Sequence, residues 1–195
     1  MKHPAPPSDL ASRLPRLRTL QAGTVLYRFH NAALGPVFFD RGTTSRLNAS
    51  DGRFGVLYTA LSAAGAFAET FLRTPGATLL DPDLVAQKAC AALALQREVR
   101  LIELHGPGAA VIGATAELCH AAPPYDLPQA WSSALHAHPV QAGGLAYRAR
   151  HNDDEICVAL FDRAQDAITI ARRERNLDAD WFYELAERYG LGLAP

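Results

Sequence analysis

Hydrophobic and polar positions along the chain follow two periods, one typical of strands and one typical of helices, which predicts a mixed α/β architecture. Short runs rich in β-branched and aromatic residues have the length of strands; they span residues 24–29, 55–61, 145–150, 156–161 and 167–171. Two further apolar runs, residues 90–95 and 99–104, favour a β-hairpin, although the alanines of the first run would also suit a helix.

The helix with the clearest start and end signals follows the strand at residues 55–61. Ser62 is placed to cap it, because a serine hydroxyl pairs with the free N–H groups of a first turn. Pro75 and Gly76 end it, so we expect it to run to about Arg73.

Other helical patterns are shorter or lie near the termini. We expect helices at residues 10–20, interrupted by Pro15, at 109–116, at 126–136, and from Asp178, expected as the cap, to Gly190. Residues 1–9 are rich in proline and are expected to form a loose arm. The chain therefore divides into an N-terminal arm with a short helix, residues 1–20, and one α/β domain, residues 21–195.

Residues 30–53 follow neither period. They are rich in Gly, Asn, Asp, Ser and Thr and contain Arg41, Arg46 and Arg53. A long irregular loop in a compact domain is usually functional or mobile, so this segment is a candidate part of a site.

The composition mainly excludes other classes of protein. A chain of 195 residues with a formal net charge of -1 and 49% hydrophobic residues fits one globular domain, and it argues against a strongly basic protein that binds nucleic acid directly. No run of 18 apolar residues predicts a membrane span, and the polar N-terminus lacks the apolar core of a signal peptide, so we expect a cytoplasmic protein. The widely spaced Cys90, Cys119 and Cys157 are expected to be buried thiols.

Familiar signatures of catalysis and metal binding are missing from the sequence. His136 and His138 form a histidine pair, but no further ligand stands nearby, so no metal site is expected. Neither a glycine-rich nucleotide loop nor a serine hydrolase elbow is present.

Polar residues inside otherwise apolar segments remain as the candidates for chemistry. They are Arg28, Tyr58, Glu69, Arg148 and Arg150. Each also has a structural interpretation: Arg28 on the solvated face of an edge strand, Tyr58 in the core, and Glu69 in an exposed ion pair with Arg73.

Taken in order, these residues lie in segments that resemble the RES domain family. The segments are LYRFHN (26–31), SRLN (45–48), GVLYTALSAAGAFAET (55–70) and GGLAYRARHNDDEICVALFDR (143–163). The resemblance implies an α+β fold similar to that of ADP-ribosyltransferases, with a central, mostly antiparallel sheet flanked by helices. It also implies an NAD-consuming toxin of a toxin–antitoxin pair, neutralised by a helix-turn-helix antitoxin of the Xre type.

The family is named for an arginine, a glutamate and a serine, and the first two fall on Arg28 and Glu69, which the resemblance makes catalytic. The serine falls on Ala149, where this chain departs from the family. A neighbouring hydroxyl such as that of Thr59 substitutes, or catalysis is weakened, or the NAD pocket serves another purpose; the sequence leaves these alternatives open.

The implied chemistry assigns roles to the other candidates. Arg28 and Arg46 suit the diphosphate of NAD, because guanidinium groups form paired, charge-assisted bonds with phosphate oxygens. Tyr58 suits stacking on the nicotinamide ring.

The residues around the end of the strand at 145–150 bear on the acceptor. Arg148, Arg150 and His151 form a cationic cluster that favours inorganic phosphate, which would make the protein an NAD phosphorylase. The alternative for Arg150 is an ion pair with Asp153 or Asp154 in a surface turn. Water as acceptor would make it a glycohydrolase, and a protein side chain an ADP-ribosyltransferase. A binding module with weak catalysis, complexed with its antitoxin, is a further alternative, and a small α/β protein that resembles the family only in fold is the last.

Overall fold

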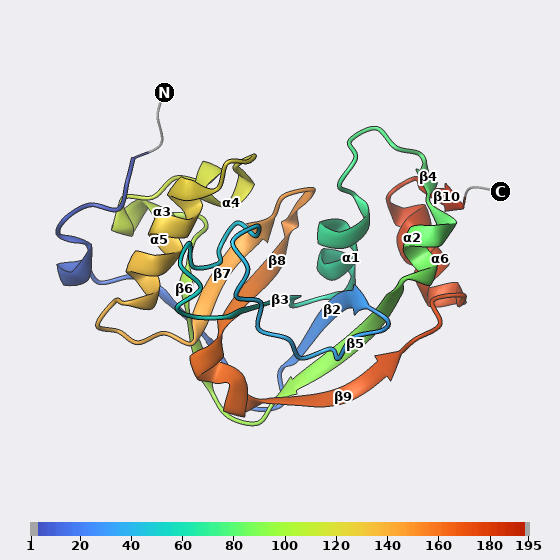
Figure 1. The fold of residues 1–195 in the computed structure, drawn as a ribbon, viewed down its shortest axis with the longest axis horizontal. Coiled ribbons are helices and arrows are strands. Elements are labelled where there is room, and N and C mark those ends of the chain that lie inside the picture. Colours follow the sequence, from blue (N-terminus) through green and yellow to red (C-terminus); the bar gives the residue numbers. More distant parts are fainter. Residues whose placement is uncertain (1–3, 194–195) are drawn as a thin grey trace.

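An eight-stranded sheet runs through the computed structural model, which describes residues 4–193 (Figure 1). Its strand order is β1-β6-β7-β8-β3-β2-β5-β9; β6 and β7 run parallel and the other neighbouring pairs run antiparallel. The strands are β1 (Leu17–Leu20), β2 (Val25–Asn31), β3 (Val56–Ala60), β5 (Lys88–Leu95), β6 (Val99–Glu103), β7 (Gly144–Ala149), β8 (Asn152–Phe161) and β9 (Ile168–Glu174). A separate parallel pair joins β4 (Leu79–Leu80) to β10 (Gly192–Leu193).

Helices flank the sheet in two groups (Figure 1). One group is α3 (Pro107–Ile112), α4 (Glu117–His120) and α5 (Asp126–His136), and the other is α1 (Ala63–Phe71), α2 (Pro82–Ala86) and α6 (Asp180–Arg188). Short 3-10 turns lie at Leu10–Ser12 and Asp162–Ala167. The predicted fold class, a single α+β domain with a mostly antiparallel central sheet, is confirmed.

The sheet opens between its two central strands. β2 and β3 meet in register only at Tyr27 and Ala60, and Val56 at the start of β3 instead forms a bridge with Asp40. Asp40 belongs to the β2–β3 loop, residues 32–55, which corresponds to the irregular segment expected from the sequence. The diverging edges of β2 and β3 therefore leave a space that this loop borders.

Hydrophobic residues hold both sides of this opening in place. On one face of the sheet, Leu26 of β2 and Leu57 of β3 share a single buried cluster, so the two halves of the sheet pack together beyond the junction. On the other face, Phe29 of β2 packs edge-on against Phe71 of α1, with ring centroids 5.1 Å apart. These contacts fix β2, β3 and α1 relative to one another.

The helix after β3 begins and ends close to where the sequence predicts. The Ser62 hydroxyl accepts a hydrogen bond from the Gly65 N–H at 2.9 Å, which confirms Ser62 as the cap, and α1 ends at Phe71. Asp178, by contrast, is not the cap of α6: the helix begins after Ala179, and the Asp178 carboxylate accepts a hydrogen bond from the Tyr183 hydroxyl at 2.7 Å.

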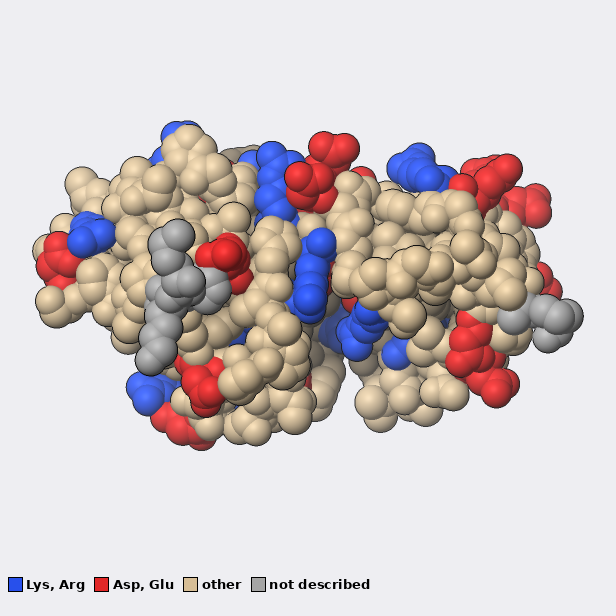
Figure 2. All heavy atoms as spheres, turned by 90° about the horizontal axis from the view of Figure 1, so that it is seen from above, with Lys and Arg blue, Asp and Glu red and all other residues tan. Residues whose placement is uncertain are grey.

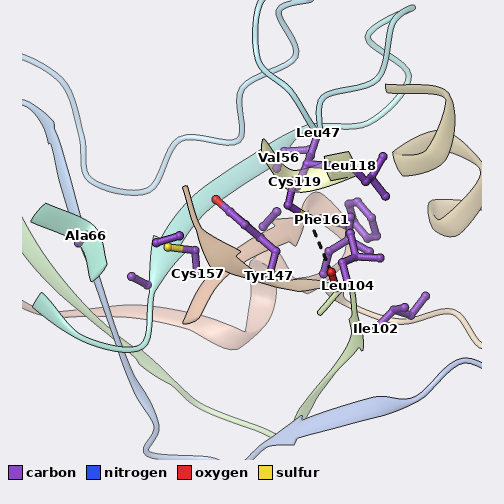
Figure 3. Close-up of a cluster of buried hydrophobic side chains, with 14 of the residues drawn as sticks. Leu47, Val56, Ala66, Ile102, Leu104, Leu118, Cys119, Tyr147, Cys157 and Phe161 are labelled. Carbon is purple, nitrogen blue, oxygen red and sulfur yellow. Dashed lines mark hydrogen bonds between the residues drawn. The ribbon is translucent and has the colours of Figure 1, made fainter. Parts of the chain in front are cut away.

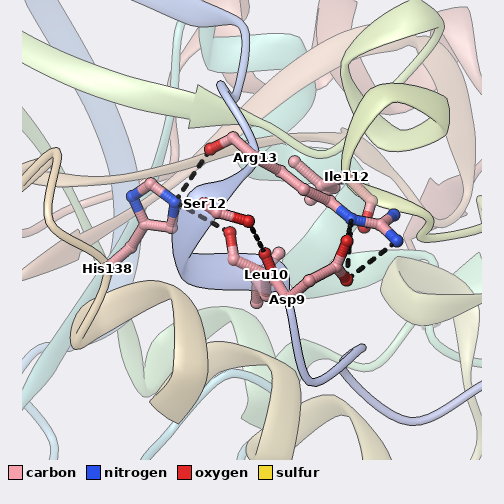
Figure 4. Close-up of polar contacts among 6 residues, drawn as sticks. All are labelled: Asp9, Leu10, Ser12, Arg13, Ile112 and His138. Atoms are coloured by element: carbon pink, nitrogen blue, oxygen red, sulfur yellow. Dashed lines mark hydrogen bonds and ion pairs between the residues drawn. The ribbon is translucent and has the colours of Figure 1, made fainter.

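The N-terminal segment differs from the expected loose arm and helix. Pro15 follows a single 3-10 turn, and residues 17–20 continue as β1, which pairs with β6. The segment is anchored from two sides. Trp131 Nε1 donates to the Pro4 carbonyl at 2.8 Å, and His138 Nε2 lies 3.1 Å from the Leu10 carbonyl, as Figure 4 shows for His138. The described residues 4–9 are thus held against α5; residues 1–3 of the expected arm lie outside the described part.

The predicted β-hairpin at residues 90–104 is wrong in its pairing. Both runs form strands, but β5 pairs with β2 and β9, whereas β6 pairs with β1 and β7. The turn at residues 96–98 therefore carries the chain from one half of the sheet to the other. Both strands are buried, and their apolar pattern specifies strands without specifying partners.

Protonation of His136 is expected to make the unfolding free energy depend on pH. Its ring stacks on Phe54 with centroids 4.0 Å apart, and its Nε2 accepts a hydrogen bond from Arg163 Nη2 at 2.7 Å. Burial, with a smaller effect of the Arg163 charge, lowers the pKa of His136 from 6.5 to about 4. The folded protein therefore holds the neutral ring, and the unfolded chain binds the extra proton between these two values.

We expect the unfolding free energy to fall as the pH drops from 7 to 4.5. One pKa unit corresponds to about 1.4 kcal/mol. After allowance for its partial exposure, His136 accounts for about 1–2 kcal/mol of this decrease in the unfolding free energy. Urea unfolding of the wild type and of His136→Phe, which keeps a ring against Phe54 but takes up no proton, measures this share. Parallel pH profiles for the two proteins would show that His136 does not carry it.

Candidate active site

A cavity of about 500 Å³ lies where β2 and β3 diverge. Its size is in the range usual for sites that bind small molecules. Its lining includes Arg28 and Phe29 of β2; Val56, Tyr58 and Thr59 of β3; Ala66, Glu69 and Thr70 of α1; Asp40 and Arg46 of the β2–β3 loop; and Tyr147, Arg150 and His151 at the end of β7. Viewed from above, the molecule is hollowed between its two groups of helices, and Lys and Arg side chains gather along the hollow (Figure 2).

Of the site residues predicted from the sequence, the structure brings together Arg28, Arg46, Tyr58, Glu69 and Arg150, which all line the cavity. They come from two strands, one helix and two loops.

Arg148, predicted from the sequence to bind the ligand, is not among the residues that line the cavity. Successive side chains of a strand point to opposite faces, and Tyr147 takes the face toward the cavity. Arg148 therefore points to the other face, where its Nη1 donates to the Asp153 carbonyl at 2.5 Å. The expected cluster of Arg148, Arg150 and His151 does not form as a unit.

Arg28 is a partly buried cation without a carboxylate partner among residues 4–193. It lies on an interior strand, between β3 and β5, and not on the edge strand of the structural alternative. Its Nη1 donates to the Pro36 carbonyl at 3.0 Å, whereas its Nε is buried without a hydrogen bond within the described residues. Burial lowers the pKa of Arg28 to about 10. Because an unpaired buried charge is costly, an anion bound in the cavity would stabilise this side chain.

Glu69 faces the cavity from α1. Ala66, Glu69 and Thr70 have the spacing of one helix face, and all three line the cavity. Glu69 Oε1 accepts a hydrogen bond from the Arg150 N–H at 2.6 Å. The ion pair with Arg73 is not formed, since Arg73 Nε donates to the Glu69 main-chain carbonyl at 3.2 Å. One carboxylate oxygen is thus held in place and the other is available to a ligand.

Tyr58 connects the cavity wall to the β2–β3 loop. Its hydroxyl accepts a hydrogen bond from the Leu47 N–H and donates one to Asn48 Oδ1, both at 2.9 Å. Asn48 Nδ2 in turn donates to Asp40 Oδ2 at 2.8 Å. From α5, Gln129 Nε2 donates to the Thr43 carbonyl at 2.7 Å. The loop that carries Arg46 is therefore tied to β3 and α5 and is not free.

We expect Tyr58→Phe to lower the unfolding free energy by about 1–3 kcal/mol, because it leaves buried partners in the loop unpaired. Hydrogen exchange at residues 40–48 should also become faster. Urea unfolding and exchange measured by mass spectrometry test both effects. Tyr183→Phe removes a single hydroxyl from α6 and is the matched control; equal effects of the two substitutions would contradict the role of Tyr58.

Arg46 and Arg150 add two cationic side chains to the lining of the cavity. The guanidinium of Arg46 lies over the ring of Tyr125, 5.8 Å from its centroid, and its Nε donates to the Ala121 carbonyl at 3.4 Å. Arg150 is exposed, and its main-chain N–H is the group that holds Glu69. Burial lowers the pKa of the neighbouring His151, although Glu69 acts in the opposite direction, so His151 is mostly neutral at pH 7.

Sequence reasoning missed several residues of the cavity. Tyr147 lies in an apolar strand, so the sequence pattern predicts a core residue there. Asp40 and Phe38 belong to a segment without periodicity. Asp40 carries no local signal, because its partner Asn48 becomes adjacent only when the loop folds.

The fold and cavity together define an α+β domain with a split, mostly antiparallel sheet and a site suited to an anionic ligand. The family model of the RES domain matches residues 22–182, and the chain belongs to this family. No curated protein sequence matches the chain.

A solved structure shares the fold. The chain is similar to one in the crystal structure of the M. tuberculosis MbcT–MbcA toxin–antitoxin complex, with a TM-score of 0.71 and 14% identity over 94% of this chain and 100% of the other. At that identity the similarity concerns the fold.

Residues 4–193 contain no helix with the length and apolar character needed to cross a membrane. Nor do they bring three or more His, Cys, Asp or Glu side chains together in a group suited to a metal ion.

Proposed function

We propose that this protein is an NAD-degrading toxin of a toxin–antitoxin pair, which breaks the bond between nicotinamide and its ribose. One observation carries the proposal: Glu69 of α1 and Arg28 of β2, a partly buried cation without a carboxylate partner among the described residues, line the same cavity. A carboxylate and an uncompensated cation are the two groups that this reaction most requires of a protein.

Glu69 has the chemistry for the bond-breaking step. Loss of nicotinamide leaves positive charge on the ribose ring, as in glycoside hydrolysis, and a fixed carboxylate stabilises that charge. The Arg150 N–H donates to one oxygen of the Glu69 carboxylate and fixes the side chain. The second oxygen can therefore contact the ribose without a change in the side-chain conformation of Glu69. Nicotinamide leaves as a neutral base because it is already a pyridinium in NAD, and it needs no acid to protonate it.

Arg28 and Arg46 are suited to the diphosphate of NAD. Their guanidinium groups have donors left over, since the described residues occupy only one nitrogen of each. Tyr58 offers its ring to the nicotinamide, while its hydroxyl remains engaged with the loop. The ligand is thereby oriented by groups that the fold already holds.

Inorganic phosphate is the acceptor that we propose. Arg150 is exposed at the cavity, beside Glu69, and its side chain has no partner among residues 4–193. A phosphate held there attacks the ribose carbon as nicotinamide leaves, which yields nicotinamide and ADP-ribose phosphorylated at that carbon. With Arg148 directed elsewhere, Arg150 supplies the charge for this step.

Product analysis by mass spectrometry, with and without added phosphate, distinguishes the acceptors. A phosphorylated ADP-ribose that appears only with phosphate supports the phosphorylase. Free ADP-ribose in both samples indicates a glycohydrolase, and a mass increase on a protein indicates an ADP-ribosyltransferase. Binding of NAD without turnover would instead favour the binding module, which Ala149 in place of the family serine makes the second candidate.

A helix-turn-helix antitoxin of the Xre type is the partner that we propose. The similar solved structure is a complex of a toxin with its antitoxin. Co-expression with a helix-turn-helix protein encoded beside this one, followed by co-purification and an NAD assay, tests the proposal. A stable complex with reduced NAD consumption supports it.

A further inference from the structure

Tyr147 is a buried tyrosine of β7 that reaches the cavity. It is 2% exposed, and Leu145, two residues earlier on the same face, belongs to the core. Tyr147 nevertheless lines the cavity together with Cys157 and Ala66. Figure 3 shows its hydroxyl directed to the side where these two residues lie and away from Leu104.

The Tyr147 hydroxyl has no hydrogen bond to any residue in the described range 4–193. The hydroxyls of tyrosines buried to this extent usually have a hydrogen-bond partner, whereas this one opens onto the cavity without one. Tyr58 shows the usual arrangement, with its hydroxyl bonded twice. Burial, with Cys157 and Glu69 nearby, raises the pKa of Tyr147 well above its ordinary value, so the hydroxyl stays protonated and available as a donor.

The lining of the cavity changes from apolar to charged with depth. Along the cavity side of α1, Ala66 is buried, Glu69 is half-buried and Arg73, just beyond the helix, is exposed. Tyr147 and Cys157 are buried like Ala66. The floor is therefore apolar and carries one unpaired hydroxyl, while the charged side chains of this wall lie nearer the mouth.

We infer that the Tyr147 hydroxyl donates a hydrogen bond to the carboxamide oxygen of nicotinamide and fixes the ring on this floor. The inference rests on the proposed cleavage of NAD. The nicotinamide of NAD is a flat aromatic ring that carries one amide, which matches a floor with a single free donor. The same placement sets the ribose beside Glu69 and leaves the diphosphate to Arg28 and Arg46.

Binding measured in the Glu69→Gln background, where NAD is not consumed, tests the inference. Tyr147→Phe should weaken NAD binding about tenfold, the usual effect of losing one buried hydrogen bond, and should change ADP-ribose binding less than about twofold. ADP-ribose is the discriminating ligand because it lacks nicotinamide. Tyr183→Phe, which removes a hydroxyl of α6 outside the cavity, should change neither affinity.

Each other outcome overturns the inference in a distinguishable way. Unchanged NAD binding in Tyr147→Phe would refute the role of Tyr147 and leave the proposed function intact. If the substitution weakened the binding of NAD and of ADP-ribose equally, the Tyr147 hydroxyl would contact the ADP-ribose part of NAD and not nicotinamide. No NAD binding by the parent protein would remove the proposed function and this inference together.

Thermal unfolding without ligand gives an independent readout. Because the hydroxyl has no partner in the described part of the protein, Tyr147→Phe should unfold at the wild-type temperature or above. A marked decrease would show that the hydroxyl serves the fold and would overturn the inference.

Discussion

Glu69→Gln is expected to lower kcat for nicotinamide release from NAD by about 10²–10⁴-fold, because an amide does not stabilise the positive charge that develops on the ribose. The glutamine keeps the size of the side chain, and its amide oxygen still accepts a hydrogen bond from the Arg150 N–H. Affinity for NAD should therefore change much less than kcat. Release of nicotinamide, followed by chromatography, measures the effect.

A charge-matched control separates this effect from a general loss of negative charge. Glu98 lies exposed in the turn between β5 and β6. Glu98→Gln should leave turnover unchanged. A Glu69→Gln protein with wild-type kcat would contradict the catalytic assignment.

Arg28→Met is expected to weaken NAD binding about a hundredfold, since it removes charge-assisted bonds to the diphosphate. Its effect on the free protein should have the opposite sign. The methionine keeps the apolar part of the side chain but removes a partly buried charge without a carboxylate partner in the described residues, so the unfolding free energy should rise by about 1 kcal/mol. Calorimetric titration and urea unfolding measure the two effects.

The contrast between the two effects is what identifies a ligand-binding arginine. Arg172→Met, on the exposed part of β9, should change neither quantity by much. If Arg28→Met instead destabilises the free protein, the hydrogen bond to the Pro36 carbonyl outweighs the cost of burial, and Arg28 is structural.

Local signals explain which elements could be predicted from the sequence. The Ser62 cap and the apolar spacing of residues 126–136 each lie within one short segment, and the structure has α1 and α5 where those signals place them. The partners of β5 and β6 depend on contacts between distant segments, and the apolar pattern of the two strands is equally compatible with a hairpin. Pairing was therefore predicted incorrectly although the strands were right.

The same distinction applies to the cavity. Arg28 and Glu69 stand out as polar residues in apolar surroundings, but the bond between Glu69 and the Arg150 N–H joins positions 81 residues apart. Tyr147 looks like a core residue, because only the opening between β2 and β3 exposes its hydroxyl to a ligand. Arg148 lies outside the cavity lining because the face that a strand turns to the cavity is set by the whole sheet.

The position of Ala149 also follows only from the fold. Its side chain is fully buried and does not line the cavity. Thr59 does line the cavity, but its hydroxyl donates to the Val158 carbonyl at 3.3 Å. Tyr147, two residues before Ala149 on the same strand face, is thus a buried residue of the cavity whose hydroxyl remains unpaired in the described residues.

A crystal structure of Glu69→Gln with NAD tests the central claim most directly. We expect the ribose carbon that bears nicotinamide to lie against the side chain of residue 69, with the diphosphate on Arg28 and Arg46. Electron density for NAD outside this cavity, or an empty cavity at saturating NAD, would contradict the proposed site.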